Sequence, residues 1–322
     1  MKKFVLLISA AVALLVGWQA FQKFPGGFGG IGLPAGIGTT PTSTEAPPPR
    51  AQDTVRIASF NIQVFGESKL SDPGVMENLV QIVRNFDLVA IQEVRAQQQD
   101  ILPHFVAMLN ADGQSHYDYV IGPRLGRSVS KEQYAYIFDR ASIEVDRQQL
   151  YTVDDPDDLL HREPLVGWFR ARGPPPEEAF TFTLAVVHTD PDEVDRELDV
   201  LDDVFFAVRD DERKEDDTIM LGDFNASDAK LRQLGQVSGM FAVVRNTPTN
   251  TLGNKQYDNI LFQQSATLEF TGRGGVYDFL RAFNLSQEQA LRVSDHLPVW
   301  AEFSVYEGGR TARMAAQPGT TR

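Results

Sequence analysis

Residues 216–227 read DDTIMLGDFNAS. The apolar, β-branched run at 218–221 is typical of a buried strand, and it delivers Asp223 and Asn225 two residues apart. Residues i and i+2 of an extended chain share a face, so both polar side chains can point into one cleft while Phe224 packs behind them. A simple turn is the alternative, because Gly, Asp and Asn commonly follow strands. The other strands of the chain discriminate between the two.

Further strand-like runs recur along the chain between stretches with helical periodicity. The predicted strands are 54–60, 88–94, 134–140, 142–151, 181–189, 218–224, 257–262 and 296–305. The predicted helices are 76–85, 101–109, 194–208 and 285–293, the last with Ser286 as N-cap and Gln289 completing a capping box. The pattern favours an α/β fold in which two sheets pack face to face with helices outside. A doubly wound nucleotide-binding fold is the alternative, but no strand leads into a Gly-rich phosphate loop.

Composition excludes several classes of function. The chain has 322 residues, a formal net charge of −14 and no cysteine. Disulfides, thiolate metal sites, a cysteine nucleophile and a lipoprotein-type anchor are therefore excluded. The acidic balance argues against holding nucleic acid by bulk attraction, but it allows an enzyme that touches phosphates through a few arginines and metal ions.

Both ends of the chain have compositions typical of segments that do not belong to a folded domain. Residues 1–22 carry Lys2 and Lys3 ahead of an apolar run, which predicts an export signal or a signal anchor. Residues 23–53 are rich in Gly, Pro and Thr and predict a disordered tether; residues 306–322 predict a disordered tail. One catalytic domain is predicted over 54–305. We expect the protein to be exported, and either secreted or anchored to the outer face of the cytoplasmic membrane.

Polar residues gather where the predicted strands end or begin. They are Asn61, Glu93, His188, Asp223, Asn225, Asp258, Asp295 and His296. If these strands lie side by side, the oxygen ligands suit a hard cation such as Mg²⁺, Mn²⁺ or Ca²⁺, and the two histidines suit proton transfer near neutral pH. That combination serves phosphate-ester hydrolysis. Any one of these residues alone fits a structural hydrogen-bonding role, and zinc is disfavoured because neither histidine has a second ligand at i+4.

Eight stretches of the sequence together resemble a known family. RIASFNIQVFGESK, LVAIQEVR, LGRSVSKEQYAYIF, HREPLV, LAVVHTDPDEVDREL, IMLGDFNAS, YDNILF and SDHLPVW occur in that order. Over 55–303 they resemble deoxyribonuclease I, within the wider endonuclease/exonuclease/phosphatase family. GDFN and SDH alone are shared with phosphatases, sphingomyelinases and abasic-site endonucleases, whereas QEVR, GRSVSKEQY and HREP look like the deoxyribonuclease branch. The resemblance implies a four-layered α/β sandwich.

Carried over position by position, the resemblance implies roles for individual residues. Glu93 is the main metal-binding carboxylate, with Asn61 beside it, and Asp223, Asn225 and Asp295 complete the phosphate and metal site. His188 with Glu132, and His296 with Asp258, are the two acid–base pairs; which histidine is the base stays open. The residues implied in DNA contact are Arg95, Arg127, Arg162 and Tyr257, of which Arg127 would lie near the minor groove.

The chain departs from the family pattern at several positions. Gln63 and Ser130 stand where the family usually has an Arg and a Tyr that contact DNA, which predicts a weaker minor-groove grip. Asp155 and Asp158 are retained in one structural calcium loop. The other such loop keeps Thr249 and Thr251 but has lost its acid. We therefore expect one structural Ca²⁺ at most, and no family disulfide.

These features predict an exported endonuclease that depends on Mg²⁺ or Mn²⁺, nicks DNA and leaves 5′-phosphates. We expect a monomer that acts on double-stranded DNA without an obligate protein partner, with a membrane tether through its N-terminus as an option. The alternatives are a phospholipid or sphingomyelin-type phosphodiesterase of the same fold, and a non-catalytic binding module. The first lacks an apolar loop for entering a bilayer, and the second is disfavoured because every expected site residue is present.

Overall fold

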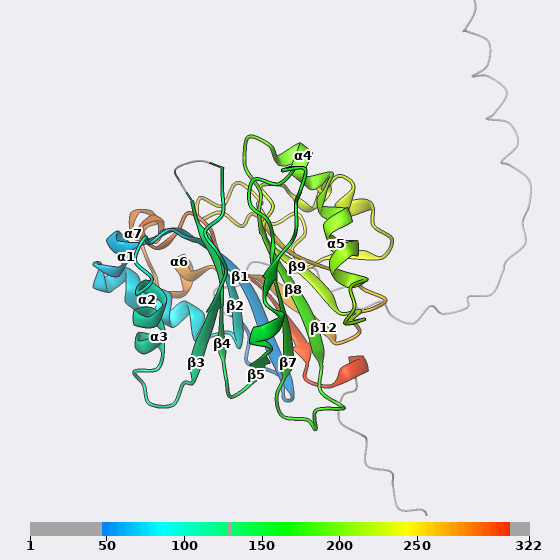
Figure 1. Ribbon diagram of the computed structural model, residues 1–322. Coiled ribbons are helices and arrows are strands. Elements are labelled where there is room, and N and C mark those ends of the chain that lie inside the picture. The colour runs from blue at the N-terminus through cyan, green and yellow to red at the C-terminus, as the bar shows by residue number, and fades with distance from the viewer. Residues whose placement is uncertain (1–46, 128–130, 310–322) are drawn as a thin grey trace, which may run out of the picture. The chain divides into compact units, whose positions relative to one another are not determined.

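Two mixed β-sheets lie face to face between two groups of helices in the computed structural model, which describes residues 47–127 and 131–309 (Figure 1). The first sheet has the strand order β12-β13-β1-β2-β4-β3, and the second has the order β10-β11-β9-β8-β7-β5 with β6 paired to β7. The first contains β1 (Thr54–Phe65), β2 (Leu88–Val94), β3 (Tyr117–Ile121), β4 (Gln133–Asp139), β12 (Phe270–Val276) and β13 (Val299–Ser304). The second contains β5 (Ile143–Val145), β6 (Tyr151–Thr152), β7 (Leu165–Ala171), β8 (Thr181–His188), β9 (Thr218–Asp223), β10 (Met240–Ala242) and β11 (Asp258–Gln263).

Helices cover the outer faces. They are α1 (Glu67–Leu70), α2 (Pro73–Val83), α3 (Ile101–Leu109), α4 (Val194–Leu198), α5 (Leu201–Arg209), α6 (Phe279–Ala282) and α7 (Gln287–Val293). Figure 1 shows α1 to α3 on the side of the first sheet and α4 and α5 on the side of the second. The predicted four-layered α/β sandwich is confirmed.

The alternation of side chains along one strand shows why the layers form. In β8, Phe182, Leu184 and Val186 belong to the core between the sheets, whereas Ala185 and Val187 belong to the separate core beneath α5. Successive residues of a strand point to opposite faces, so a strand that is apolar throughout needs a partner on each side. The second sheet has the first sheet on one side and α5 on the other.

Most predicted elements agree with the structure, and two differ. The strand predicted at 142–151 is divided into β5, a short 3₁₀ turn and β6, because the Asp146 side chain accepts a hydrogen bond from the backbone N–H of Gln148 and turns the chain. The helix predicted at 194–208 is two helices, α4 and α5. The chain tightens between them, where Val200 N–H bonds the carbonyl of Glu197 three residues back.

One further predicted feature is confirmed, and four strands were not predicted. The capping box at the start of α7 is confirmed, since Ser286 and Gln289 exchange both expected hydrogen bonds. Four strands were not predicted: β3, β7, β10 and β12. The sequence of β12, FTGRGGV, did not predict a strand, because its glycines lower the β-propensity.

Residues just outside the limits predicted at 54 and 305 contact the domain. Arg273 donates to the carbonyl of Pro49 at 2.8 Å, Arg50 pairs with Asp87 at 2.7 Å, and the 3₁₀ turn η4 (Glu307–Gly309) follows β13. The predicted segment 1–22, most of 23–53 and residues 310–322 lie outside the described residues. Among the described helices, none is long and apolar enough to span a membrane.

Strands β8 and β9 run parallel and approach each other closely at their ends. Val187 lies opposite Gly222, and His188 lies opposite Asp223. Gly222 has a φ of +150°, and a Cβ placed there would lie 1.9 Å from the carbonyl oxygen of Val187. Only glycine fits this position, which is one residue before Asp223.

We predict that Gly222→Ala destabilises the fold by about 3 kcal/mol or more, because the new Cβ must push β8 and β9 apart. Urea unfolding followed by circular dichroism measures this change. Gly113→Ala is the matched control: Gly113 also has a positive φ, +70°, but no atom lies within 4 Å of its Cβ position. We expect about 1 kcal/mol there. Equal losses in the two variants would contradict the close approach.

Candidate active site

The polar residues at the strand ends continue the face that forms the core between the sheets. His188 follows Leu184 and Val186 on β8, and Asp223 follows Ile219 and Leu221 on β9, each at intervals of two. Both polar side chains therefore point into the space between the two sheets rather than toward the helices.

The strand register aligns the catalytic candidates. Asp258 at the start of β11 lies opposite Asp223, which in turn lies opposite His188. Asn61 in β1 comes from the other sheet, and its side-chain amide donates to Asp223 at 3.1 Å. The predicted convergence of strand ends is thus what the structure shows.

Glu93 reaches the site through a distorted strand. Its φ is +62°, and the registers of β2 with both β1 and β4 shift just beside it. Positive φ in a non-glycine residue is strained, and bulges of this kind re-aim side chains at functional sites. The Glu93 carboxylate accepts the N–H of Val64 at 2.8 Å and the Asn61 amide at 3.3 Å, which hold it in place.

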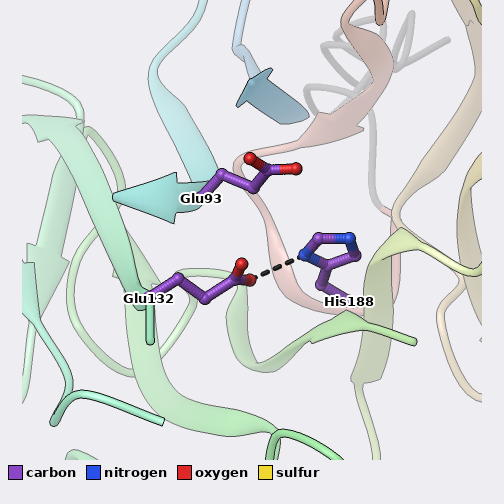
Figure 2. A group of neighbouring side chains, drawn as sticks. All are labelled: Glu93, Glu132 and His188. Atoms are coloured by element: carbon purple, nitrogen blue, oxygen red, sulfur yellow. Dashed lines mark hydrogen bonds and ion pairs between the residues drawn. The ribbon is translucent and has the colours of Figure 1, made fainter. Parts of the chain in front are cut away.

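His188 and Glu132 form the first buried pair. His188 Nδ1 lies 2.6 Å from Glu132 Oε1, and Figure 2 shows this contact with the Glu93 carboxylate extending toward the same space. Burial lowers the pKa of His188, but the hydrogen bond to Glu132 and the negative charges of Glu132 and Asp223 outweigh it and raise the pKa above its ordinary value. Burial raises the pKa of Glu132, but His188, Arg162 and Arg95 bring it below its ordinary value.

His296 and Asp258 form the second buried pair. His296 Nδ1 lies 2.9 Å from Asp258 Oδ2, and the Thr249 hydroxyl donates to the same oxygen at 2.7 Å. Burial lowers the pKa of His296, but the charges of Asp258 and Asp223 more than offset this and raise the pKa to about 10. The Asp258 carboxylate therefore favours the protonated form of this imidazole.

One carboxylate oxygen faces both imidazoles. Asp223 Oδ2 lies 3.6 Å from Nε2 of His188 and 3.5 Å from Nε2 of His296. Burial raises the pKa of Asp223, but the two histidines lower it below its ordinary value. Each imidazole therefore has a carboxylate on Nδ1 and faces the common space with Nε2.

Three more predicted residues lie around this centre. Asn225 is half-buried; its backbone N–H donates to Asp223 at 2.9 Å, and its side-chain amide donates to the carbonyl of Thr189 at 2.9 Å. Asp295 Oδ1 lies 3.9 Å from Nε2 of His296, and the Tyr257 ring lies beside the His296 ring with centroids 5.7 Å apart. The structure brings all three to the same site.

The three arginines predicted to contact DNA differ in their surroundings. Arg95 is partly exposed and pairs with Glu93 at 3.1 Å and Glu132 at 3.5 Å, so it lies at the site. Arg162 is buried beneath the site, where its guanidinium donates to the carbonyls of His188 and Thr189. This position suits support of the strand end, and direct DNA contact by Arg162 stays a prediction.

Arg127 lies against the loop that carries the predicted calcium ligands. It pairs with Asp158 at 3.0 Å and with Glu193 at 2.9 Å. Asp155 instead accepts the N–H of Leu160, and no metal-ligand group among the described residues contains either aspartate. Structural Ca²⁺ at Asp155 and Asp158 stays a prediction.

The positions that depart from the family pattern lie in different surroundings, and one of them is outside the described residues. Gln63 has a φ of +36° and its N–H donates to the Asn61 side chain, whereas Ser130 lies outside the described residues. Thr249 and Thr251, predicted as remnants of a calcium loop, are buried against the segment that carries His296.

The sequence did not predict the supporting roles of two residues. Thr249 accepts the backbone N–H groups of Tyr257 and Asp258 while donating to the Asp258 carboxylate, so it orients that acid. Ser294 donates to the carbonyl of Asn61 at 2.7 Å and accepts the N–H of His296 at 3.0 Å, which joins β1 to the segment that carries His296. The sequence signal for Ser294 was its place two residues before the histidine, in the SDH motif.

Comparison with known proteins places this geometry in a family. Residues 58–296 match the model of the endonuclease/exonuclease/phosphatase family. The chain belongs to this family. It is 33% identical over 262 residues to deoxyribonuclease gamma of Rattus norvegicus, covering 76% of this chain and 83% of the relative. It is 34% identical over 263 residues to deoxyribonuclease-1-like 1 of Sus scrofa, covering 78% and 82% respectively.

Solved structures share the fold at low sequence identity. A humanized D. rerio TDP2 structure aligns with a TM-score of 0.53 at 15% identity, covering 78% of this chain and 99% of that one. The human Nocturnin catalytic domain aligns with a TM-score of 0.53 at 14% identity, covering 79% and 94%. These likenesses support the α/β sandwich, whereas the kinship with deoxyribonucleases comes from the more similar sequences.

The donor set of the site fits a hard divalent cation. The ligand atoms of Glu93, Glu132 and His188 lie within 4.8 Å of one another, but Glu132 and His188 already bind each other. Glu93 is then the carboxylate best placed to hold an ion. Asp295 Oδ1 is buried without a hydrogen-bond partner, which also fits an oxygen-ligated cation.

We predict that Asp258→Asn lowers the pKa of His296 from about 10 toward 6.5, because it removes the largest charge that favours the imidazolium. Histidine NMR on metal-free protein measures this change. A raised folded-state pKa adds stability that is complete below pH 6.5 and lost as pH rises toward 10, so the variant should lack that loss.

Glu132→Gln is the matched control, since Glu132 contacts the other histidine and should leave the titration of His296 in place. An ordinary pKa for His296 in the wild-type protein would contradict the pairing.

Proposed function

We propose that the protein is an exported endonuclease that requires a divalent metal and hydrolyses DNA phosphodiester bonds, leaving 5′-phosphate and 3′-hydroxyl ends. One observation carries the proposal: two imidazoles, each backed by a buried carboxylate, turn Nε2 toward one Asp223 oxygen at 3.6 and 3.5 Å. The relatives at about one-third identity, which are named deoxyribonucleases, support DNA as the substrate.

The two pairs can divide the proton transfers of hydrolysis. One imidazole accepts a proton from water as the water oxygen bonds to phosphorus, and the other supplies a proton to the O3′ atom as its bond to phosphorus breaks. Glu132 and Asp258 hold the two rings on Nδ1, so each Nε2 is the atom that exchanges the proton. Either histidine can fill either role.

The remaining residues orient the phosphate and offset its charge. Mg²⁺ or Mn²⁺ bound by Glu93 with Asn61, Asp223 and Asp295 would neutralise charge that develops on the phosphate oxygens. Asn225 stands at the same edge, and the partly exposed Arg95 can reach a phosphate of the DNA backbone. We infer a monomer that acts on double-stranded DNA outside the cell without a protein partner.

We predict that the full chain nicks supercoiled plasmid in Mg²⁺ or Mn²⁺ and that EDTA abolishes the nicking. His188→Ala and His296→Ala should each lower the rate by at least roughly 10²-fold, because each removes one proton-transfer group. Gel electrophoresis of the plasmid forms gives the rates. His104→Ala is the control, since His104 is exposed on α3 and should have no effect.

Two outcomes would overturn the proposal. Folded protein that does not nick DNA but cleaves sphingomyelin would make the protein a lipid phosphodiesterase. Folded protein that hydrolyses no phosphodiester would make it a binding module.

We also predict that kcat/KM on DNA falls steeply with increasing salt, because contacts between arginine and phosphate release counterions. Arg95→Gln should lower the activity and reduce the slope of log kcat/KM against log salt by about 1. Cleavage of bis(p-nitrophenyl) phosphate is the control, since a substrate without a backbone should show little salt dependence. Equal salt dependence for the two substrates is the contrary result.

A further inference from the structure

A second acidic cluster lies at the opposite end of the sheets from the histidines. Asp217 immediately precedes β9, Glu269 precedes β12, and Glu307 lies in η4 after β13. Ligand oxygens of all three lie within 4.8 Å of one another. Asp217 immediately precedes one end of β9 and Asp223 ends the other, so the cluster is about 20 Å from the catalytic centre.

Two of these carboxylates are buried and incompletely satisfied. Asp217 is 1% exposed and Glu269 is 2% exposed. Asp217 Oδ1 and Glu269 Oε2 are buried and have no hydrogen-bond partner. Within residues 47–127 and 131–309, no Lys, Arg or His forms an ion pair with any of the three acids. Buried carboxylates are costly unless a donor or an opposite charge accompanies them.

The neighbouring polar groups leave these oxygens available. Glu215 is occupied, since it accepts the Thr181 hydroxyl, the Trp168 ring N–H and the N–H of Asp217. Glu269 uses its other oxygen to accept the N–H of Gly308. Glu307 accepts the N–H of Thr181 at 3.1 Å. These bonds fix the acids in place without neutralising them.

We propose that Asp217, Glu269 and Glu307 form a binding site for a hard divalent cation, with Ca²⁺ as the best match. Two oxygens that share a Ca²⁺ ion at about 2.3–2.6 Å can lie up to about 5 Å apart, which accommodates the observed spacing. Ca²⁺ accepts several carboxylates and tolerates irregular geometry, whereas Mg²⁺ demands an octahedron and usually keeps several waters. The exposed side of Glu307 leaves room for the water ligands of the ion.

Proton occupancy is the competing way to neutralise the same acids. Burial, reinforced by the charge of Glu269, raises the pKa of Asp217 to about 10, and burial raises the pKa of Glu307 to about 7. A bound cation would reverse these shifts, because it favours the ionised carboxylates. The two explanations therefore make opposite predictions about added Ca²⁺.

The ion would join the two sheets. Asp217 leads into the second sheet, whereas Glu269 leads into β12 and Glu307 follows β13, both in the first sheet. Glu307 also donates its backbone N–H to the carbonyl of Glu178, in the segment that leads into β8. Binding should therefore stabilise the whole fold at the end away from catalysis.

The test uses full-length protein stripped with EDTA, dialysed and titrated with CaCl₂ or MgCl₂. The variant Glu93→Gln removes the main metal-binding carboxylate of the catalytic site and isolates the second site. At about 100 times the Kd, we expect Ca²⁺ to raise the Tm of wild-type protein and of Glu93→Gln by about 5–10 °C. The double variant Asp217→Asn, Glu269→Gln should lose this shift and should bind one Ca²⁺ fewer in titration calorimetry.

Two further results keep the test decisive. The double variant should melt at a higher temperature than wild-type protein in EDTA, since it removes mutual repulsion, and it should still nick plasmid in Mg²⁺. Should it fail to fold, Glu307→Gln alters an exposed acid and should weaken Ca²⁺ binding at least tenfold. A Glu93→Gln protein whose Tm is unchanged by Ca²⁺ would overturn the proposal and assign protons to the cluster.

Discussion

The catalytic centre depends on one buried carboxylate oxygen that faces two imidazoles. Asp223 Oδ2 also accepts the Asn61 amide, so three groups from separate parts of the chain converge on it. An ionised carboxylate this deeply buried is unstable unless charges and hydrogen bonds accompany it. Its partners come from both sheets, so the arrangement requires that the sheets are packed correctly. Folding and assembly of the site are therefore the same event.

Four of the ten described non-glycine residues with positive φ lie at or next to the site. Gln63, Val64, Glu93 and Asn225 all have positive φ, although none is a glycine. Such conformations each cost about 1–3 kcal/mol and persist only where the surrounding structure fixes them. Here the extensive apolar core between the sheets supplies that stability, with the aromatic stack of Phe169, Phe180 and Phe182 as one part of it. The strained backbone at Glu93 and at residues 63–64 directs these two segments toward a common space.

The sequence predicted those residues of the site that lie at the ends of recognisable strands. Asp223, His188 and Asp258 end or begin apolar strands, so the strand pattern predicted that they meet if those strands lie side by side, as they do. Glu132 follows no such rule, because it precedes β4 and meets His188 only after folding; it was found through family resemblance. Long-range hydrogen bonds were also beyond local reasoning, as with Thr249.

The same limit explains why the sequence did not predict how charged residues are buried and paired. Arg162 is buried beneath the site, and Arg127 pairs with Asp158. These outcomes depend on how loops fold over each other, and neither propensity nor hydrophobic period encodes that information. The break between α4 and α5 has a similar origin, because the buried Glu197 accepts N–H groups from two other segments and fixes the first turn separately.

Buried carboxylates lie at both ends of β9, and their negative charge is compensated in different ways. At the catalytic end, carboxylates alternate with imidazoles and an arginine, so the protein supplies its own positive charge. At the other end, no Lys, Arg or His among the described residues pairs with Asp217 or Glu269, whose carboxylates lie beside that of Glu307. The counter-charge there has to come from solution, as an ion or as protons. Since the chain has no cysteine to join its strands covalently, an ion held between the sheets would stabilise the fold without perturbing the catalytic pairs.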